Sequence, residues 1–293
     1  MYNQIDSNKR RTWALVIIFT IVIAAIGWFL GYYFDYGYGA VVVALIFSLI
    51  MTLFSYYSGD KVALWSAGAQ LIEKNDNPYV YRIVENLCIT AGVPTPKVYI
   101  IPSEAINAFA TGRDPKHSSI AVTVGAVNKL ENEELEGVIA HELSHVKNYD
   151  IRLMTIVVVL VGAISILANM FFRGSMFGGK SDDNKGNNVL MIVGVILIIL
   201  SPIIAQLIQL AISRRREYLA DASGSLLTRY PEGLARALEK IANDKNVLDQ
   251  ASSATAHLFI ANPLKNSGRL LANAFSTHPP IEDRIKKLKE MTV

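Results

Sequence analysis

The sequence predicts a mainly α-helical membrane protein with four transmembrane helices and a polar α+β domain that carries a small β-sheet. The first observation is composition. Of the 293 residues 52% are hydrophobic, and the mean hydropathy is +0.31, both high for a soluble protein. The second observation is the distribution of the apolar residues, which lie mostly in four nearly uncharged blocks. Each block has about twenty residues, enough to cross a hydrocarbon core of roughly 30 Å. The blocks cover residues 13–33, 39–57, 153–172 and 189–212.

These blocks divide the chain into alternating membrane and polar parts. We expect residues 1–57 to form an N-terminal transmembrane hairpin and residues 151–212 to form a second one. Residues 58–150 and 213–293 are then the two polar parts. The first apolar block is longer than the 7–15 apolar residues of a signal peptide, and no small-residue cleavage site follows it, so we interpret it as an anchor.

The lysines and arginines beside the blocks predict the topology. They precede the first block and follow the second and the fourth, at Lys9, Arg10, Arg11, Lys61 and residues 214–216. The short loop 34–38 has none. Because basic loops stay on the cytoplasmic side, both termini and both polar parts are predicted to be cytoplasmic. Three basic residues in the predicted outer loop 172–188 argue against this topology.

Cysteine count and charge limit the function classes. Cys88 is the only cysteine, so no intrachain disulfide forms, which suits a reducing compartment. The net charge of +3 is modest and matches the basic residues beside the membrane, so nothing indicates nucleic acid as a partner.

The first polar part predicts one helix and a small sheet. Residues 80–91 have helical periodicity, and Gly92 with two nearby prolines ends them. Residues 97–102 and 120–124 are typical of strands. Residues 107–111 are predicted to form either a further short strand or a hydrophobic turn.

The motif with the clearest chemistry is His141-Glu142-Leu143-Ser144-His145. Acidic residues before it indicate a helix start, with Asn132 or Asn128 as the cap. Residues four apart on a helix are neighbours, so both imidazoles can bind one Zn²⁺. Glu142 is then placed to act as the general base. The alternative is a chance coincidence of histidine and glutamate on a helix.

A catalytic zinc needs a third protein ligand. The candidates are His117, His257, His278 and several acids. Glu217 and Asp221 stand out because they are four apart on a predicted helix and share one face. On that face Glu217 is a candidate metal ligand, and Asp221 is a candidate acceptor of a hydrogen bond from a ligand histidine. The alternative is a solvated helix with arginine–glutamate pairs.

Several motifs together resemble the membrane zinc metallopeptidases of the HtpX heat-shock type, relatives of the zinc-dependent CAAX prenyl proteases. The resemblance covers nearly the whole chain. It rests on the four blocks and on His141-Glu142-x-x-His145 extended through Asn148 and Asp150, Asn107-Ala108-Phe109, Arg216-Glu217-Tyr218-x-Ala220-Asp221, and Ser276-Thr277-His278-Pro279-Pro280 with Arg284.

The resemblance implies a zincin-like (gluzincin) catalytic domain with one Zn²⁺ per chain and Glu217 as the third ligand. It implies that Asn107, Ala108 and Phe109 lie on an edge strand that aligns the substrate backbone. It further implies a multi-pass protein of the bacterial cytoplasmic (inner) membrane. The expected role is stress response and quality control of misfolded membrane proteins, beside an ATP-dependent membrane protease.

Other polar residues have open roles. His278 is a candidate oxyanion stabiliser, because an imidazole can donate a hydrogen bond. Asn148 and Asp150 are candidates for orienting the motif helix or His145, with a structural cap as the alternative. His257 is expected to be packed or on the surface. Arg215 and Arg216 are expected to anchor the chain at the membrane, with a contact to the site as the alternative.

We therefore predict a zinc metalloendopeptidase that acts at the cytoplasmic membrane face on membrane proteins or membrane-associated polypeptides. Zinc activates a water, Glu142 takes its proton and later returns one to the leaving amine. The alternatives are an intramembrane-cutting metalloprotease, a prenyl-protein (CAAX-type) protease, and a non-catalytic membrane adaptor that uses zinc structurally.

Overall fold

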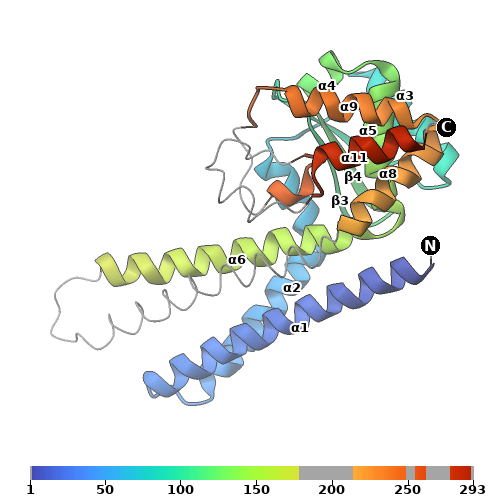
Figure 1. The fold of residues 1–293 in the computed structure, drawn as a ribbon. Coiled ribbons are helices and arrows are strands. Elements are labelled where there is room, and N and C mark those ends of the chain that lie inside the picture. Colours follow the sequence, from blue (N-terminus) through green and yellow to red (C-terminus); the bar gives the residue numbers. More distant parts are fainter. Residues whose placement is uncertain (1, 178–213, 249–254, 262–277, 292–293) are drawn as a thin grey trace.

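The computed structural model describes residues 2–177, 214–248, 255–261 and 278–291. Three long helices extend from a domain that contains the remaining helices and all the described strands (Figure 1). The predicted span 189–212 and most of the predicted outer loop 172–188 lie outside the described residues.

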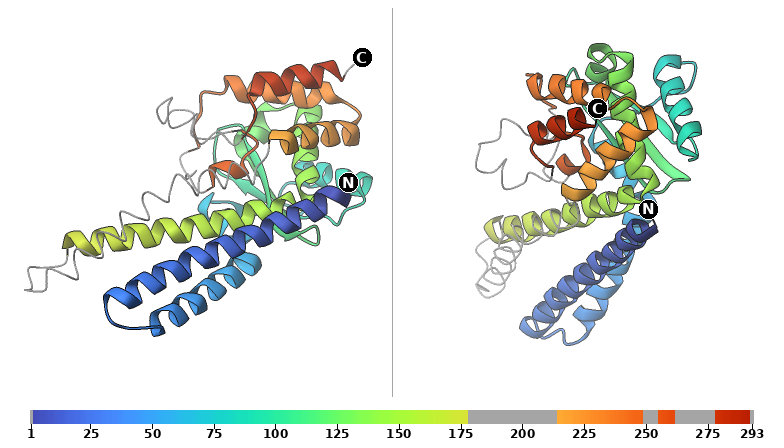
Figure 2. Two further views of the ribbon diagram at one scale, coloured as in Figure 1. Left: turned by 60° about the horizontal axis from the view of Figure 1, so that its bottom comes forward. Right: turned by 45° about the vertical axis from the view of Figure 1, so that its right-hand side comes forward.

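Helices α1 (Tyr2–Tyr33) and α2 (Gly39–Ser66) form an antiparallel hairpin (Figure 2). Both are long and apolar enough to cross a membrane. Apolar side chains such as Trp28, Val43 and Leu49 are exposed on them, as expected for surfaces that face lipid. The first two predicted blocks are therefore confirmed as candidate membrane spans.

The third predicted block lies in α6 (Asp150–Phe177). Its first turns are covered by protein, because Leu153, Val157 and Leu160 are buried. Among the described residues, α6 is long and apolar enough to span a membrane only when it is counted together with the preceding helix, α5. The axes of these two helices are bent by 83° relative to each other.

The sheet has four strands in the order β1-β2-β4-β3. β2 and β4 are parallel, while β3 and β4 are antiparallel, so β3 is an edge strand. The predicted strands at 97–102 and 120–124 are confirmed, and the segment with two possible interpretations, 107–111, is a strand from Ala108. The strands are β1 (Gln70–Leu71), β2 (Lys97–Ile101), β3 (Ala108–Asp114) and β4 (His117–Thr123).

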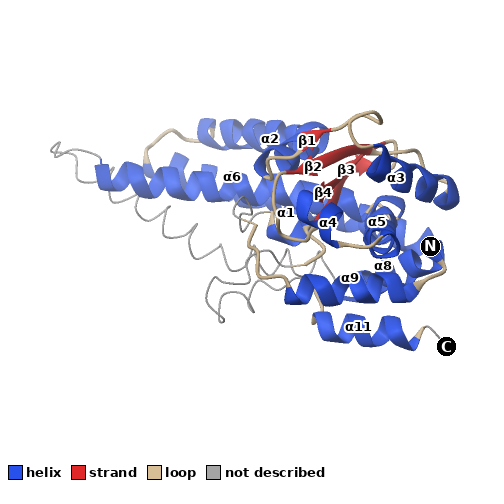
Figure 3. Cartoon of the chain, turned by 90° about the horizontal axis from the view of Figure 1, so that it is seen from above, coloured by secondary structure: helices blue, strands red, loops and turns tan. Residues whose placement is uncertain are grey.

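Helices pack around α5 on the side away from the strands (Figure 3). The predicted helix 80–91 is confirmed as α3, which the Asn77 side chain caps and which ends at Gly92 with φ of 67°. The helices of the domain are α3 (Pro78–Ala91), α4 (Val124–Lys129), α5 (Asn132–Lys147), α8 (Arg214–Thr228), α9 (Pro231–Asn243), the short 3-10 helix η1 (Ala256–Leu258) and α11 (Ile281–Glu290).

The cap of α5 differs from the sequence prediction. The N-cap residue is Glu131, whereas Asn132 begins the helix and Asn128 lies within α4. The Glu131 backbone N–H donates to the Glu134 carboxylate at 2.8 Å, and Lys240 Nζ donates to the same oxygen at 2.7 Å. The buried Glu134, paired with a lysine of α9, therefore caps the start of α5. The asparagines near the helix start in the sequence do not indicate this contact.

The single cysteine lies in the core. Cys88 is 1% exposed, and burial raises the pKa of its thiol to about 12. Because the thiolate is the reactive form, about one thiol in ten thousand would be ionised at pH 8.

We expect Cys88 to resist maleimide labelling in the folded protein and to react fully after denaturation. The measurement is mass spectrometry of the purified protein at pH 8 with and without denaturant. Fast labelling of the folded protein would contradict the packing of α3 against the sheet domain.

Candidate metal centre

Helix α5 brings two histidines to one face. The ring centroids of His141 and His145 are 4.8 Å apart, and the two Nε2 atoms are 3.2 Å apart. Two nitrogens bound to one tetrahedral zinc at about 2.05 Å would lie about 3.3 Å apart. The spacing of the two nitrogens therefore fits a shared metal ion.

Helix α8 brings a carboxylate to the same place. Glu217 Oε2 lies 3.7 Å from His141 Nε2, and Glu217 Oε1 lies 3.7 Å from His145 Nε2. Ligand atoms of all three residues lie within 4.8 Å of one another. Glu217 Oε2 is buried and has no hydrogen-bond partner within the described part of the chain. A buried acceptor without a donor is costly, so a cation suits this position.

The approach of α8 to α5 depends on Gly224. A Cβ atom added at Gly224 would lie 2.9 Å from the backbone nitrogen of His141. Only glycine lets the two backbones come this close, and this approach places Glu217 opposite the histidines.

Each histidine has a carboxylate on its other ring nitrogen. Asp221 Oδ1 lies 2.9 Å from His141 Nδ1, and Asp150 Oδ2 lies 3.0 Å from His145 Nδ1. A carboxylate can only accept, so each Nδ1 donates and each Nε2 keeps its lone pair for the metal. The structure thus places Asp221 against His141, and it places Asp150, for which sequence left two roles open, against His145.

Arg284 from α11 holds Asp221. Its Nε and Nη2 donate to the two carboxylate oxygens at 2.9 and 2.7 Å, and its Nη1 donates to the Ile260 carbonyl at 2.9 Å. Burial alone would raise the pKa of Asp221, but the charge of Arg284 and the contact with His141 hold that pKa well below its usual range. The sequence motifs did not predict a role for Arg284. Its position on the apolar stripe of α11, between Ile281 and Leu288, was the available signal.

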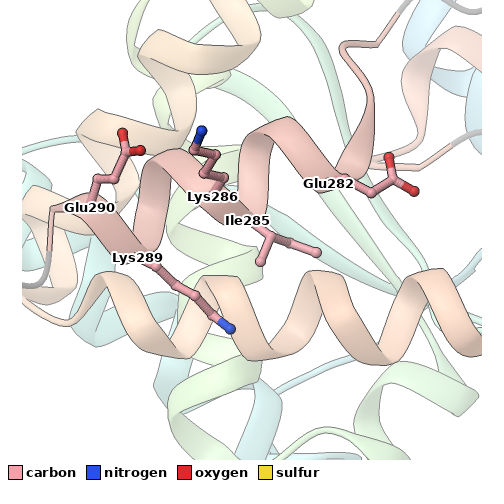
Figure 4. Close-up of a pocket in the computed structure, with 5 residues that line it drawn as sticks. All are labelled: Glu282, Ile285, Lys286, Lys289 and Glu290. Carbon is pink, nitrogen blue, oxygen red and sulfur yellow. The ribbon is translucent and has the colours of Figure 1, made fainter.

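The residues on the outer face of α11 do not contact the candidate metal ligands or Asp221. Figure 4 shows the residues of a surface pocket there, Glu282, Ile285, Lys286, Lys289 and Glu290. Arg284, on the same helix, is 1% exposed. α11 therefore separates a solvated face from the face that supports the metal centre.

The side chain of Glu142 extends from α5 to the edge strand β3. It is 2% exposed and accepts a hydrogen bond from the Ala110 backbone. Burial raises the pKa of Glu142 to about 8, with His145 opposing and Glu217 adding to the shift. A carboxyl group that exchanges its proton near neutral pH is suited to general acid–base work.

The predicted substrate segment lies at the sheet edge but is already partly paired. The Ala108 carbonyl accepts from Ile260 N–H at 3.0 Å, and the Asn107 side chain donates to the Ala261 carbonyl at 3.2 Å. Phe109 packs edge-on against Phe259. Residues 255–261 thus lie along the start of β3, which the sequence did not predict.

The three other candidate histidines lie in different surroundings. His278 Nε2 lies 3.5 Å from Glu217 Oε2, and burial lowers the pKa of His278 to about 4, so it is neutral at pH 7. His117 is exposed and pairs with Asp114 in the β3–β4 turn. His257 is packed, with Nε2 3.2 Å from the Met154 carbonyl. Of these three histidines, only His278 contacts one of the candidate metal ligands.

The chain is similar to known peptidases. The model of peptidase family M48 matches residues 74–292. A protease HtpX homolog of Dictyoglomus thermophilum is 43% identical over 99% of this chain and 94% of its own length. Homologs of Lactobacillus helveticus and Syntrophobacter fumaroxidans are 46% and 48% identical, over 99% and 97% of this chain and 100% and 99% of their own lengths.

The fold also matches a solved structure. The crystal structure of S. mikatae Ste24p aligns with a TM-score of 0.51 at 18% identity, covering 98% of this chain and 67% of that one. At this identity the match concerns the fold alone.

We predict that Gly224→Ala weakens zinc binding by at least about tenfold, because α8 must move away from His141. Zinc affinity would be measured by competition with a chelator. Gly162→Ala is the matched control, since nothing lies within 4 Å of a Cβ added there. Equal affinity in Gly224→Ala and the control would contradict the role of this contact.

We predict that Asp221→Asn weakens zinc binding by about 10–100-fold and lowers the free energy of unfolding by about 3–5 kcal/mol, because Arg284 loses its buried counter-charge. Zinc titration and thermal unfolding test the two effects. Asp283→Asn, an exposed change on α11, should alter neither, and an unchanged Asp221→Asn protein would refute the assignment.

Proposed function

This chain belongs to peptidase family M48 and is a membrane-bound metallopeptidase, and we propose that it is a zinc endopeptidase that cleaves membrane-associated polypeptides at the cytoplasmic membrane face. The observation that carries the proposal is the convergence of His141, His145 and Glu217 beside Glu142. Two imidazoles and one carboxylate form a donor set that suits zinc and leaves a coordination position open.

The zinc, one per chain, would supply Lewis acidity to the scissile carbonyl and to water. The protein supplies the proton transfers. Glu142 receives a proton from the attacking water and passes one to the leaving amine. His278, neutral at pH 7, is proposed to donate a hydrogen bond to the oxyanion.

The substrate is proposed to pair with the edge strand β3. Asn107 directly precedes this edge strand, Ala108 and Phe109 begin it, and Glu142 contacts it at Ala110. An added strand binds mainly through its backbone, so cleavage would depend weakly on sequence, as quality control of misfolded proteins requires. Pairing at Ala108 would displace the Ile260 N–H that now occupies its carbonyl.

The membrane assignment rests on topology. We propose four spans in two hairpins, with both termini and the metal centre in the bacterial cytoplasm, because basic residues lie in the N-terminal turns of α1 and directly precede Glu217. α5 ends at Lys147 and α6 begins at Asp150, so the metal centre lies close to the start of the third proposed span. Membrane-protein substrates follow from this placement. An ATP-dependent membrane protease as partner rests on the resemblance alone.

We predict that Glu142→Gln loses cleavage by about 10²–10⁴-fold and keeps its zinc, because the general base acts without binding the metal. Glu217→Ala should lose both zinc and cleavage. The test uses detergent-purified protein, a misfolded membrane-protein substrate and metal analysis. Glu133→Gln, an exposed change on the same helix, is the control.

Two results would contradict the proposal. Full zinc content in Glu217→Ala would remove it as a ligand, and normal cleavage by Glu142→Gln would remove the proposed base. Faster cleavage of a prenylated CAAX peptide than of the membrane protein would instead favour a prenyl-protein protease.

A further inference from the structure

A buried polar cluster joins the N-terminal transmembrane helix to the catalytic domain. We call Asn8, Asp150 and Arg216 the junction cluster. They come from α1, α6 and α8, and the two views of Figure 2 show the N-terminal end of α1 beside the domain end of α6. Asn8 is 3% exposed, although it is a polar residue near the start of an apolar helix.

The Asn8 amide reaches two acceptors. Its Nδ2 donates to Asp150 Oδ1 at 2.6 Å and to the Asn148 carbonyl at 2.9 Å. Asn148 is the C-cap residue of α5, and Tyr149 after it has a φ of 61°. Carbonyl groups at a helix end lack partners within the helix. Asn8 therefore stabilises the bend that separates α5 from α6.

Arg216 completes the cluster from the third helix. Its Nη1 donates to Asn8 Oδ1 at 3.0 Å and to Asp150 Oδ1 at 3.3 Å. Arg216 directly precedes Glu217, so the same contact holds the start of the helix that carries this carboxylate.

Asp150 divides its two oxygens between the cluster and the metal centre. Oδ1 accepts from Asn8 and Arg216, while Oδ2 lies 3.0 Å from His145 Nδ1. The hydrogen bonds to Oδ1 restrict the orientation of the Asp150 carboxylate, and in this orientation Oδ2 faces the His145 imidazole. Groups that orient a ligand histidine in this way commonly change metal affinity by 10–100-fold when removed.

We propose that Asn8 and Arg216 are positioning residues that couple the N-terminal transmembrane helix to the metal centre through Asp150. The proposal rests on His145 being a metal ligand, as proposed above. Seating of α1 against the domain then sets the orientation of His145. A chain whose first helix is displaced in the membrane would bind zinc more weakly, although no residue of α1 is itself a ligand.

The test measures zinc affinity in the full-length protein by chelator competition. We predict about tenfold weaker binding in Asn8→Ala and about 10–100-fold weaker binding in Asp150→Asn. The double variant should be no weaker than Asp150→Asn alone, because Asn8 acts through that carboxylate. Asp6→Asn, an exposed change less than one turn away on α1, is the control and should bind zinc like the unaltered protein.

A second readout separates positioning from general stability. The visible spectrum of the Co²⁺-substituted protein reports ligand geometry, and it should change in Asn8→Ala and in Arg216→Gln. A purely structural role would lower the melting temperature of the metal-free protein and leave both the spectrum and the affinity of the folded fraction unchanged. If Asn8→Ala fails to fold, Arg216→Gln provides the same test.

The outcomes distinguish this proposal from the proposed function. Unchanged affinity in Asn8→Ala and Arg216→Gln, or effects of Asn8→Ala and Asp150→Asn that multiply, would overturn the coupling. Full zinc content in both His145→Ala and Glu217→Ala would overturn the metal centre itself.

Discussion

The structure depends on the mutual compensation of charges that have almost no contact with water. His141, Glu142, His145, Glu217, Asp221 and Arg284 are each at most 3% exposed. A buried charge is tolerated only where another charge or hydrogen bonds balance it. Asp221 is balanced by Arg284 and Asp150 by Arg216. Glu217 pairs with no guanidinium group in the part of the chain that the structure describes, and burial favours a protonated Glu142. A divalent cation held by His141, His145 and Glu217, as proposed above, would balance the remaining negative charge.

Two separate supports hold the two histidines. Asp221 from α8, fixed by α11, orients His141, while Asp150 from α6, fixed by α1 and α8, orients His145. The first support lies within the polar domain, and the second joins α8 of that domain to the long helices α1 and α6. Geometry at the metal thus depends on both halves of the molecule, which explains why the domain and the long helices pack through polar contacts as well as apolar ones.

Local spacing made half of the site predictable. Residues four apart, such as His141 and His145 or Glu217 and Asp221, lie on one face of a helix. Each of these two pairs could therefore be inferred without a structure. Contacts between distant segments could not. Asn8 meets Asp150 across 142 residues and Arg216 across 208, and no periodicity links such positions. The sequence therefore favoured membrane anchoring for Arg216 and left contact with the site as an alternative, and its Nη1 lies in the junction cluster. The pairing of β3 with residues 255–261 was missed for the same reason.

The chemistry of the junction cluster explains why its member on α1 is an asparagine. The position lies between an anion and a cation, so it must donate to Asp150 and accept from Arg216 at once. An amide does both and has no net charge. An aspartate would place a second negative charge against Asp150, and a lysine would compete with Arg216 and offer no acceptor. A leucine would suit the apolar helix but leave both partners with unmet hydrogen bonds in a buried place. Among these side chains, only the amide serves the helix that enters the membrane and the carboxylate that orients a histidine.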